Sequence, residues 1–158
     1  MEQNQGYRAN VAAIIVNAKG EFLLTKHVES REEEWDFVKG GMEEGEEHVD
    51  TLRREITEEL GVAVVYEVLQ RSDVAIIYDW SKETQQRRGF RGPARISYWV
   101  LYKEGTITIQ QTELSKYEWF SEEKIVEVLL VSGFPKIIVE NFMQEWKNVK
   151  SLRFSSSK

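Results

Sequence analysis

The sequence lacks cysteine altogether, and its 158 residues include only two prolines and two histidines. Without cysteine, disulfide bonds and thiolate metal sites are excluded. The two histidines, His27 and His48, are too few for a histidine-rich zinc centre. No apolar run reaches the length that spans a membrane, and the N-terminus shows no signal-peptide pattern. These absences predict a cytoplasmic protein with no membrane partner.

The chain also lacks an excess of positive charge. Its formal net charge is −6, which argues against a broad basic surface for binding duplex DNA. A local basic groove for a phosphate-rich ligand is still compatible with this charge. With 41% hydrophobic residues, a chain of this length can bury one sizeable core. We therefore expect a single domain over residues 1–150 and a flexible tail over residues 151–158. The sequence does not indicate the oligomeric state.

The most informative segment is residues 40–62, which read GGMEEGEEHVDTLRREITEELGV. Carboxylates at positions i, i+3 and i+4 lie on one face of a helix. Glu55, Glu58 and Glu59 therefore fall within an arc of about 100°, at roughly 100° per residue. Clustered carboxylates repel one another unless a cation neutralises them, and a site with oxygen ligands alone favours Mg²⁺, with Mn²⁺ as a substitute. A separate apolar stripe consists of Val49, Leu52, Ile56 and Leu60.

This segment resembles the signature of the Nudix hydrolases, G-x5-E-x7-R-E-U-x-E-E-x-G-U, in which U is a bulky aliphatic residue. Every fixed position of the signature is matched. The matching residues are Gly40, Glu46, Arg54, Glu55, Ile56, Glu58, Glu59, Gly61 and Val62. The resemblance implies an α/β fold of the Nudix type, an α/β/α sandwich with a mixed sheet against which the carboxylate helix packs.

The resemblance also implies an enzyme, a Nudix pyrophosphohydrolase. In this reaction water attacks a phosphorus atom within a diphosphate linkage, with Mg²⁺ as the cofactor. Glu55, Glu58 and Glu59 would be metal ligands, together with the carbonyl group of Gly40. Glu58, Glu59 and Arg54 are the catalytic residues expected within the signature, and Arg54 would orient a glutamate.

Two further glutamates have different expected roles. The catalytic base of Nudix enzymes often lies outside the signature, and Glu113 is our leading candidate for it. Glu113 could equally be an ordinary exposed glutamate of a loop, since no pKa can be read from a sequence. Glu46, inside the signature, is expected to have a structural role.

The segments on either side of the carboxylate helix are rich in β-branched and aromatic residues and predict strands. The predicted strands are residues 11–16, 21–26, 35–38, 62–70, 73–78, 94–103, 106–110 and 117–120. Residues 94–103 and 106–110 are expected to form a hairpin, and residues 81–93 a polar loop. A helix is expected to begin after Ser121, and a last helix to run from Pro135 to about Trp146.

Motifs outside the signature narrow the resemblance to RNA pyrophosphohydrolases and diadenosine polyphosphate hydrolases. Residues 6–11, GYRANV, are similar to the G-Y-R-P-N-V opening of these enzymes, and residues 35–41, WDFVKGG, to their W-x-F-P-x-G-G. Ala9 and Val38 depart from the pattern by replacing prolines, and His27 stands where arginine is usual. The resemblance implies a dinucleoside polyphosphate, such as diadenosine tetraphosphate, or a 5′-triphosphate RNA end as the substrate.

A substrate with three or more phosphates needs cations beyond the metal, and a base needs an aromatic surface for stacking. The residues expected to contact substrate are Arg8, Lys26, His27, Trp35, Lys39, Tyr78, Arg87, Arg88, Arg91 and Phe134. Arg95 and Trp80 are further candidates of the same chemical kinds. The alternative for each cation is to keep a loop soluble, and for each aromatic residue to pack in the core.

Other functions compete with this interpretation. A house-cleaning nucleoside triphosphate pyrophosphatase would use the same signature. A noncatalytic, nucleotide-sensing module of the Nudix type would be expected to lose signature glutamates, and none is missing here. Isomerases of isoprenoid diphosphates share the fold but usually rely on a cysteine, which this chain lacks.

Overall fold

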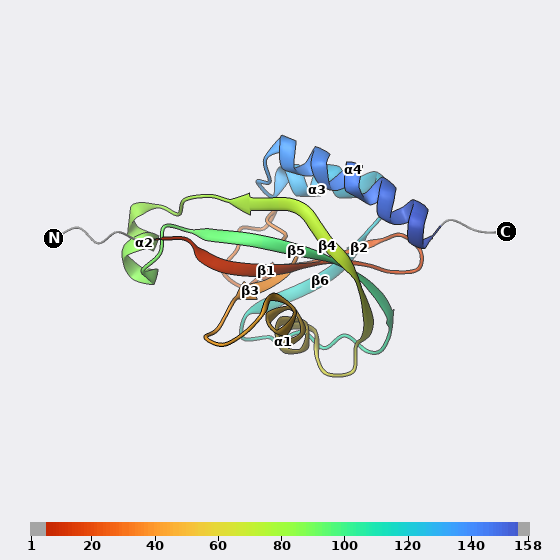
Figure 1. Ribbon diagram of the computed structural model, residues 1–158, viewed down its shortest axis with the longest axis horizontal. Coiled ribbons are helices and arrows are strands. Elements are labelled where there is room, and N and C mark those ends of the chain that lie inside the picture. Colours follow the sequence, from red (N-terminus) through yellow and green to blue (C-terminus); the bar gives the residue numbers. More distant parts are fainter. Residues whose placement is uncertain (1–5, 155–158) are drawn as a thin grey trace.

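The computed structural model describes residues 6–154 (Figure 1). The strands are β1 (Arg8–Val16), β2 (Phe22–His27), β3 (Val38–Gly41), β4 (Val65–Ile77), β5 (Pro93–Glu104) and β6 (Leu114–Phe120). The helices are α1 (His48–Leu60), α2 (Lys82–Arg88), α3 (Glu122–Val131) and α4 (Lys136–Arg153). Within the described range, no helix combines the length and the apolar composition that a membrane crossing requires.

The six strands form one mixed sheet. Its order is β4-β5-β1-β2-β6, and β3 pairs with β1. β1 and β5 run parallel over their whole contact, from Arg8 opposite Pro93 to Val16 opposite Leu101, while the other ladders are antiparallel. The mixed sheet predicted from the sequence is therefore confirmed.

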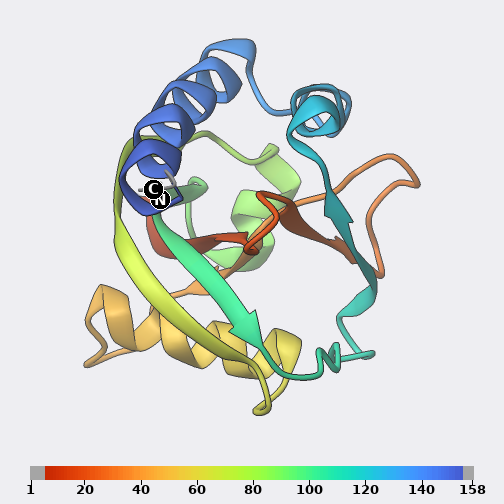
Figure 2. The same ribbon diagram turned by 90° about the vertical axis from the view of Figure 1, so that its right-hand side faces the viewer.

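Helices cover both faces of the sheet. α1 lies against one face, and α3 and α4 lie together against the other (Figures 1 and 2). The α/β/α sandwich is confirmed, with α1 on the opposite side of the sheet from the two C-terminal helices.

Each face of the sheet has its own core. Under α3 and α4, the rings of Trp99 and Trp146 stack with centroids 5.7 Å apart. On the other face, Leu52, Ile56 and Leu60 of α1 are almost fully buried, as the apolar stripe predicts. Val49, the fourth residue of that stripe, lies in the first turn of α1 and is 39% exposed.

Strand β4 corrects a boundary. The sequence predicts two strands, residues 62–70 and 73–78, but β4 is one continuous strand. Its pairing with β5 is irregular around the polar residues at its centre. Glu145 of α4 satisfies that centre: its carboxylate accepts hydrogen bonds from the Ser72 hydroxyl at 2.6 Å, the Asp73 amide at 2.5 Å and the Trp99 indole at 2.7 Å. Polar residues that predict a strand end are thus stabilised by a distant helix.

The predicted hairpin after β5 is wrong in its second strand. The amides of Thr108 and Gln110 donate to the carbonyl groups of Leu60 and Glu59, at 2.8 and 3.2 Å. The last carbonyls of a helix have no partner within it, so this segment completes the end of α1 instead of pairing with β5. The contact brings residues 108–110 beside the carboxylate helix.

Two further helix predictions need correction. The predicted polar loop contains α2, which begins where the Ser81 hydroxyl accepts a hydrogen bond from the Thr84 amide and ends at Gly89 in the left-handed conformation, with φ 83°. Both are recognised helix-end signals, so the sequence did contain the information. α4 continues past Trp146 to Arg153, because Val149 is also buried in the core. The helix includes residues 151–153 of the predicted tail, and residues 155–158 lie outside the described residues.

Candidate active site

Two glycines bring charged side chains onto the backbone that leads into α1. A Cβ atom added to Gly40 would collide with the Glu55 carboxylate, and one added to Gly41 would collide with the Arg8 guanidinium. Only glycine leaves room for these two contacts. The structure thereby places Arg8, predicted to contact phosphate, beside the loop that precedes the carboxylate helix.

Arg54 is the centre of a charge network on α1. Its guanidinium donates to Glu46 at 2.6 and 3.0 Å, to the Gly41 carbonyl at 2.9 Å and to Glu55 at 2.8 Å. The hydrogen bonds from Arg54 lower the pKa of Glu46 to about 2 and, reciprocally, raise the pKa of Arg54. Glu46 thus fixes Arg54, in agreement with its predicted structural role, and Arg54 in turn orients Glu55.

Glu55 and Glu59 form a close carboxyl pair. Glu59 is 6% exposed and also accepts a hydrogen bond from the Lys39 backbone amide. Burial raises the pKa of Glu59 to about 8; the charge of Lys39 opposes the shift and that of Glu55 adds to it. Burial likewise raises the pKa of Glu55. Burial therefore favours the protonated form in this pair, and a bound cation would favour the ionised carboxylates instead.

Glu58, the third carboxylate of α1, lies at the exposed edge of the Glu55–Glu59 pair. Its side chain is 46% exposed and lies 3.4 Å from Arg54. Among residues 6–154, no three His, Cys, Asp or Glu side chains are gathered in a metal-binding arrangement. Arg54 contacts both Glu55 and Glu58, while a hydrogen bond links Glu55 to Glu59. The chemistry of the three carboxylates nevertheless fits a hard divalent cation, which takes oxygen ligands.

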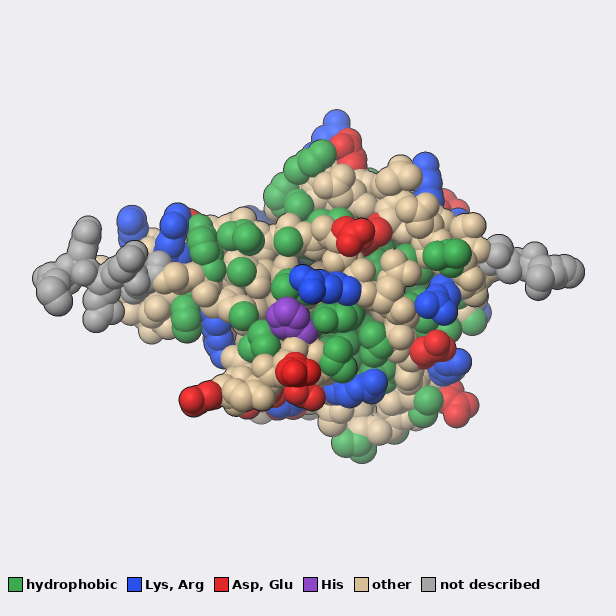
Figure 3. All heavy atoms as spheres, viewed as in Figure 1, with side chains coloured by type: hydrophobic (Ala, Val, Ile, Leu, Met, Phe, Trp, Pro, Cys, Tyr) green, Lys and Arg blue, Asp and Glu red, His purple; other side chains and the backbone are tan. Residues whose placement is uncertain are grey.

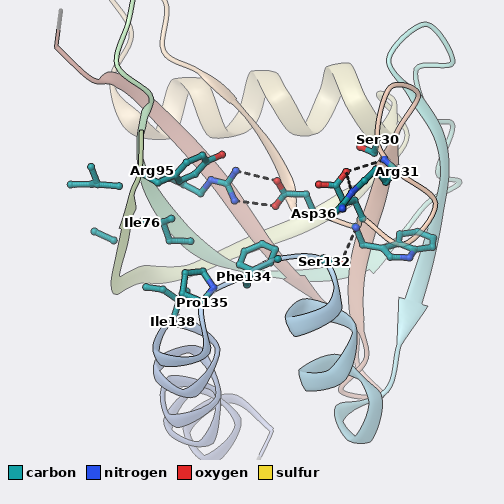
Figure 4. Close-up of a pocket in the computed structure, with 15 residues that line it drawn as sticks. Ser30, Arg31, Asp36, Ile76, Arg95, Ser132, Phe134, Pro135 and Ile138 are labelled. Carbon is teal, nitrogen blue, oxygen red and sulfur yellow. Dashed lines mark hydrogen bonds and ion pairs between the residues drawn. The ribbon is translucent and has the colours of Figure 1, made fainter. Parts of the chain in front are cut away.

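A cavity of about 570 Å³ opens on the opposite face of the sheet (Figure 4). Its walls come from the β2–β3 connection, the end of β4 and the start of α4. Trp35, Tyr78 and Phe134, all predicted to contact substrate, line it together. Its volume and aromatic lining suit a nucleoside-sized group.

The floor of the cavity is an ion pair that the sequence did not reveal. Arg95 donates to both oxygens of Asp36, at 3.0 and 3.1 Å (Figure 4). Arg95 is 3% exposed, so it is a buried partner of Asp36 and not the exposed phosphate contact considered from the sequence. In the sequence, Asp36 occupies the variable position of the W-x-F motif, and its charge between Trp35 and Phe37 is the one sign of a buried partner.

Lys39 connects the cavity with the carboxylate helix. Its ammonium lies 3.7 Å from Asp36, while its backbone amide donates to Glu59. The cavity and the carboxylates thus meet at one residue of β3.

Lys26 and His27, both predicted to contact substrate, are bonded within the chain. Lys26 is 5% exposed, and its ammonium donates to carbonyl groups of residues 31, 32 and 34. His27 is partly buried at the end of β2, where its Nδ1 accepts a hydrogen bond from the Glu29 amide at 3.1 Å. Both side chains are engaged with the β2–β3 connection.

The arginines of the predicted polar loop gather at one end of the molecule. Arg87 and Arg88 lie in the last turn of α2, where basic side chains are visible in Figure 3. Arg88 lies over the Trp80 ring at 5.0 Å, and Arg91 pairs with Asp79 at 2.9 Å. α1 is placed nearer the middle of the molecule than α2 (Figure 1). The structure does not bring these arginines together with the carboxylates.

Glu113 lies in an exposed turn before β6. Its amide donates to the Gln110 carbonyl at 3.0 Å, and its own carbonyl accepts from the Val28 amide at 2.8 Å. Gln110 in turn donates its amide to the Glu59 carbonyl at 3.2 Å. Glu113 is thus three residues from a segment anchored on the end of α1.

Comparison with known proteins agrees with this arrangement. The model of the NUDIX domain family matches residues 6–142. The chain belongs to the Nudix family and is a Nudix hydrolase, as predicted from the signature. An RNA pyrophosphohydrolase of Sulfurovum sp. (strain NBC37-1) is 32% identical over 134 residues, covering 81% of this chain and 84% of the relative. One from Campylobacter jejuni subsp. jejuni (strain 81-176) is 29% identical over 136 residues, covering 82% and 86%.

Solved structures support the fold. An Ap4A hydrolase of C. elegans in a binary complex superposes with a TM-score of 0.66 at 14% identity, covering 89% of this chain and 98% of that one. A NUDIX hydrolase from Nitrosomonas europaea has a TM-score of 0.60 at 20% identity, covering 88% and 90%. At these identities the likeness concerns the fold alone.

Proposed function

We propose that the protein hydrolyses a diphosphate linkage in a nucleoside polyphosphate with Mg²⁺ as cofactor, and that its substrate is a 5′-triphosphate RNA end. The observation that carries the reaction is the carboxylate set of α1 within a complete signature. The RNA end is supported by the names of relatives that match about four fifths of the chain. Diadenosine tetraphosphate, which has the same polyphosphate character, is the competing substrate.

The site residues divide the work between binding and chemistry. The aromatic cavity would hold a base, and Lys39 and Arg8 would contact the phosphates beside Gly40 and Gly41. Glu55, Glu58 and Glu59 would hold Mg²⁺, which shields phosphate charge and polarises the P–O bond when bound. Arg54 keeps Glu55 oriented for this task.

Glu113 would accept the proton of the attacking water. We expect Glu113→Gln to lower kcat by about 10²-fold or more with little change in KM, because a general base contributes about 10²–10⁴-fold to the chemical step. Steady-state kinetics separates the two parameters. Glu118→Gln, on an exposed part of the next strand, is the control. A change in KM alone would identify Glu113 as a substrate contact instead, and unchanged kinetics as an ordinary surface residue.

The substrate proposal is tested by a panel assay with Mg²⁺. Triphosphate RNA, diadenosine tetraphosphate, free nucleoside triphosphates and ADP-ribose are compared by kcat/KM, and the products are separated so that pyrophosphate and monophosphate release can be distinguished. We expect RNA ends or the dinucleotide to be preferred. A far higher kcat/KM for ADP-ribose or a modified deoxynucleoside triphosphate would overturn the substrate assignment. Full activity in excess chelator would overturn the assignment of Mg²⁺ as cofactor.

A further inference from the structure

The wall of the cavity nearest β2 is a loop built around a buried ammonium group. Lys26 is the fifth residue of β2, and the chain then crosses residues 28–37 before β3 begins. Ser30, Arg31 and Trp35 of this loop line the cavity (Figure 4). The loop has no strand or helix of its own. Its shape depends on a few internal contacts, such as the hydrogen bond from the Arg31 amide to the Glu34 carboxylate at 2.9 Å, and on contacts made from outside it.

Lys26 supplies the central contact. Its Nζ donates to the carbonyl groups of Arg31 at 3.0 Å, of Glu32, and of Glu34 at 3.4 Å. It also lies 5.0 Å from the centroid of the Trp35 ring. An ammonium group has three N–H donors, and each of these carbonyls is one acceptor for them. The loop is therefore wrapped around the charge.

The geometry separates Lys26 from the carboxylates. Side chains alternate between the faces of a strand, and Phe22 and Leu24 belong to the core under α3 and α4, while Leu23 belongs to the core under α1. Lys26 has the parity of Phe22 and Leu24. It therefore projects to the cavity side of the sheet, opposite the carboxylate helix.

We propose that Lys26 is a positioning residue for substrate, which holds the loop of residues 30–35 in the shape that forms the cavity wall. It does so without touching the reacting phosphates. The proposal rests on the proposed function only in its kinetic consequence, because the anchoring of the loop is a property of the free protein.

The chain provides a matched control. Lys116 pairs directly with Lys26 across the β2–β6 ladder, and its Nζ also lies 5.4 Å from the centroid of the Trp35 ring. It is exposed and makes none of the carbonyl contacts found for Lys26 among the described residues. Lys26→Met and Lys116→Met thus each remove a positive charge near the Trp35 ring. Only Lys26→Met also removes the donor to the three carbonyl groups of the loop.

Limited trypsin digestion reports on the loop without any turnover. Arg31 lies in the loop with an exposed side chain, so it is a cleavage site whose rate depends on local opening. We expect cleavage after Arg31 to be at least tenfold faster in Lys26→Met than in wild type, and to change less than twofold in Lys116→Met. Lys26→Arg keeps the charge and several donors and should restore most of the protection. Lys26→Gln, with one donor group, replaces Lys26→Met if the latter does not fold.

Kinetics on triphosphate RNA then tests the positioning role. We expect Lys26→Met to raise KM at least tenfold while kcat changes less than threefold, and Lys116→Met to leave both near wild type. Wild-type cleavage at Arg31 in a folded Lys26 variant, or an opened loop with unchanged KM, would overturn the proposal. Equal effects of the two lysine variants would also overturn it, since charge and not anchoring would then be the cause. If the wild-type protein fails to hydrolyse any substrate of the panel, the proposed function fails, while the digestion still decides whether Lys26 anchors the loop.

Discussion

Glu59→Gln and Glu58→Gln are each expected to reduce kcat by more than about 100-fold, beyond the 10–100-fold typical of residues that only support a metal ligand. The amide is nearly isosteric with the carboxylate but has no charge to neutralise the cation. Initial rates at saturating Mg²⁺ provide the measurement, and Glu140→Gln, on the exposed face of α4, is the control. Wild-type turnover in both variants would remove α1 from the catalytic assignment.

Glu59→Gln should also stabilise the metal-free protein, relative to the wild type, above neutral pH. Burial raises the pKa of Glu59 to about 8, so the folded protein binds a proton that the unfolded chain, with a pKa near 4.5, has released. The free energy of unfolding in chelator should therefore fall as pH rises from about 4.5 to about 8. Glu59→Gln removes this dependence, and Mg²⁺ should restore stability to the wild type. Urea titrations at several pH values test the sign.

Asp36→Asn should cost about 3 kcal/mol of unfolding free energy, because it leaves the buried Arg95 guanidinium without a counter-charge. Arg95→Met should cost less, about 1–2 kcal/mol, since Asp36 is about one third exposed and keeps Lys39 nearby. The double variant should resemble Arg95→Met. Denaturant unfolding of the three variants at pH 7 gives these differences. Equal costs for the two single variants would contradict the asymmetry in burial.

The ion pair also predicts an acid response. Burial opposes ionisation of Asp36, but the positive charges of Arg95 and Lys39 outweigh it and lower the pKa of Asp36. The resulting stability is present above the unfolded pKa of about 3.9 and is lost as pH falls through the lower folded value. Asp36→Asn should therefore flatten the acid limb of the stability curve below about pH 4.

The sequence predicted the fold and the reaction well because these depend on local patterns. The signature positions fix which residues precede and occupy α1, and helical periodicity places Leu52, Ile56 and Leu60 on the sheet. The spacing of the carboxylates alone could not predict which neighbours each of them contacts. Glu55 contacts both Glu59 and Arg54, whereas Glu58 lies at the exposed edge of the network, and this depends on side-chain conformations that local sequence does not determine.

The cavity was less predictable because its parts are distant in the chain. The Asp36–Arg95 pair joins residues 59 positions apart, and Ser132 accepts a hydrogen bond from the Trp35 amide across 97 positions. The sequence indicates Lys26 as a phosphate contact only through its positive charge. Its burial follows from the path of the loop that closes over it, which no motif in the sequence encodes.

The contacts of Glu145 also concern the edge of the sheet. β4 is an edge strand of the sheet, and an open edge offers a row of amide and carbonyl groups to a strand of another chain. The polar stretch around Ser72 and Asp73 interrupts the regular pairing, and Glu145 takes up the Asp73 amide. The Asp73 amide is therefore already bound within the chain. The helix that completes the core thus also contacts the edge strand of the sheet through Glu145.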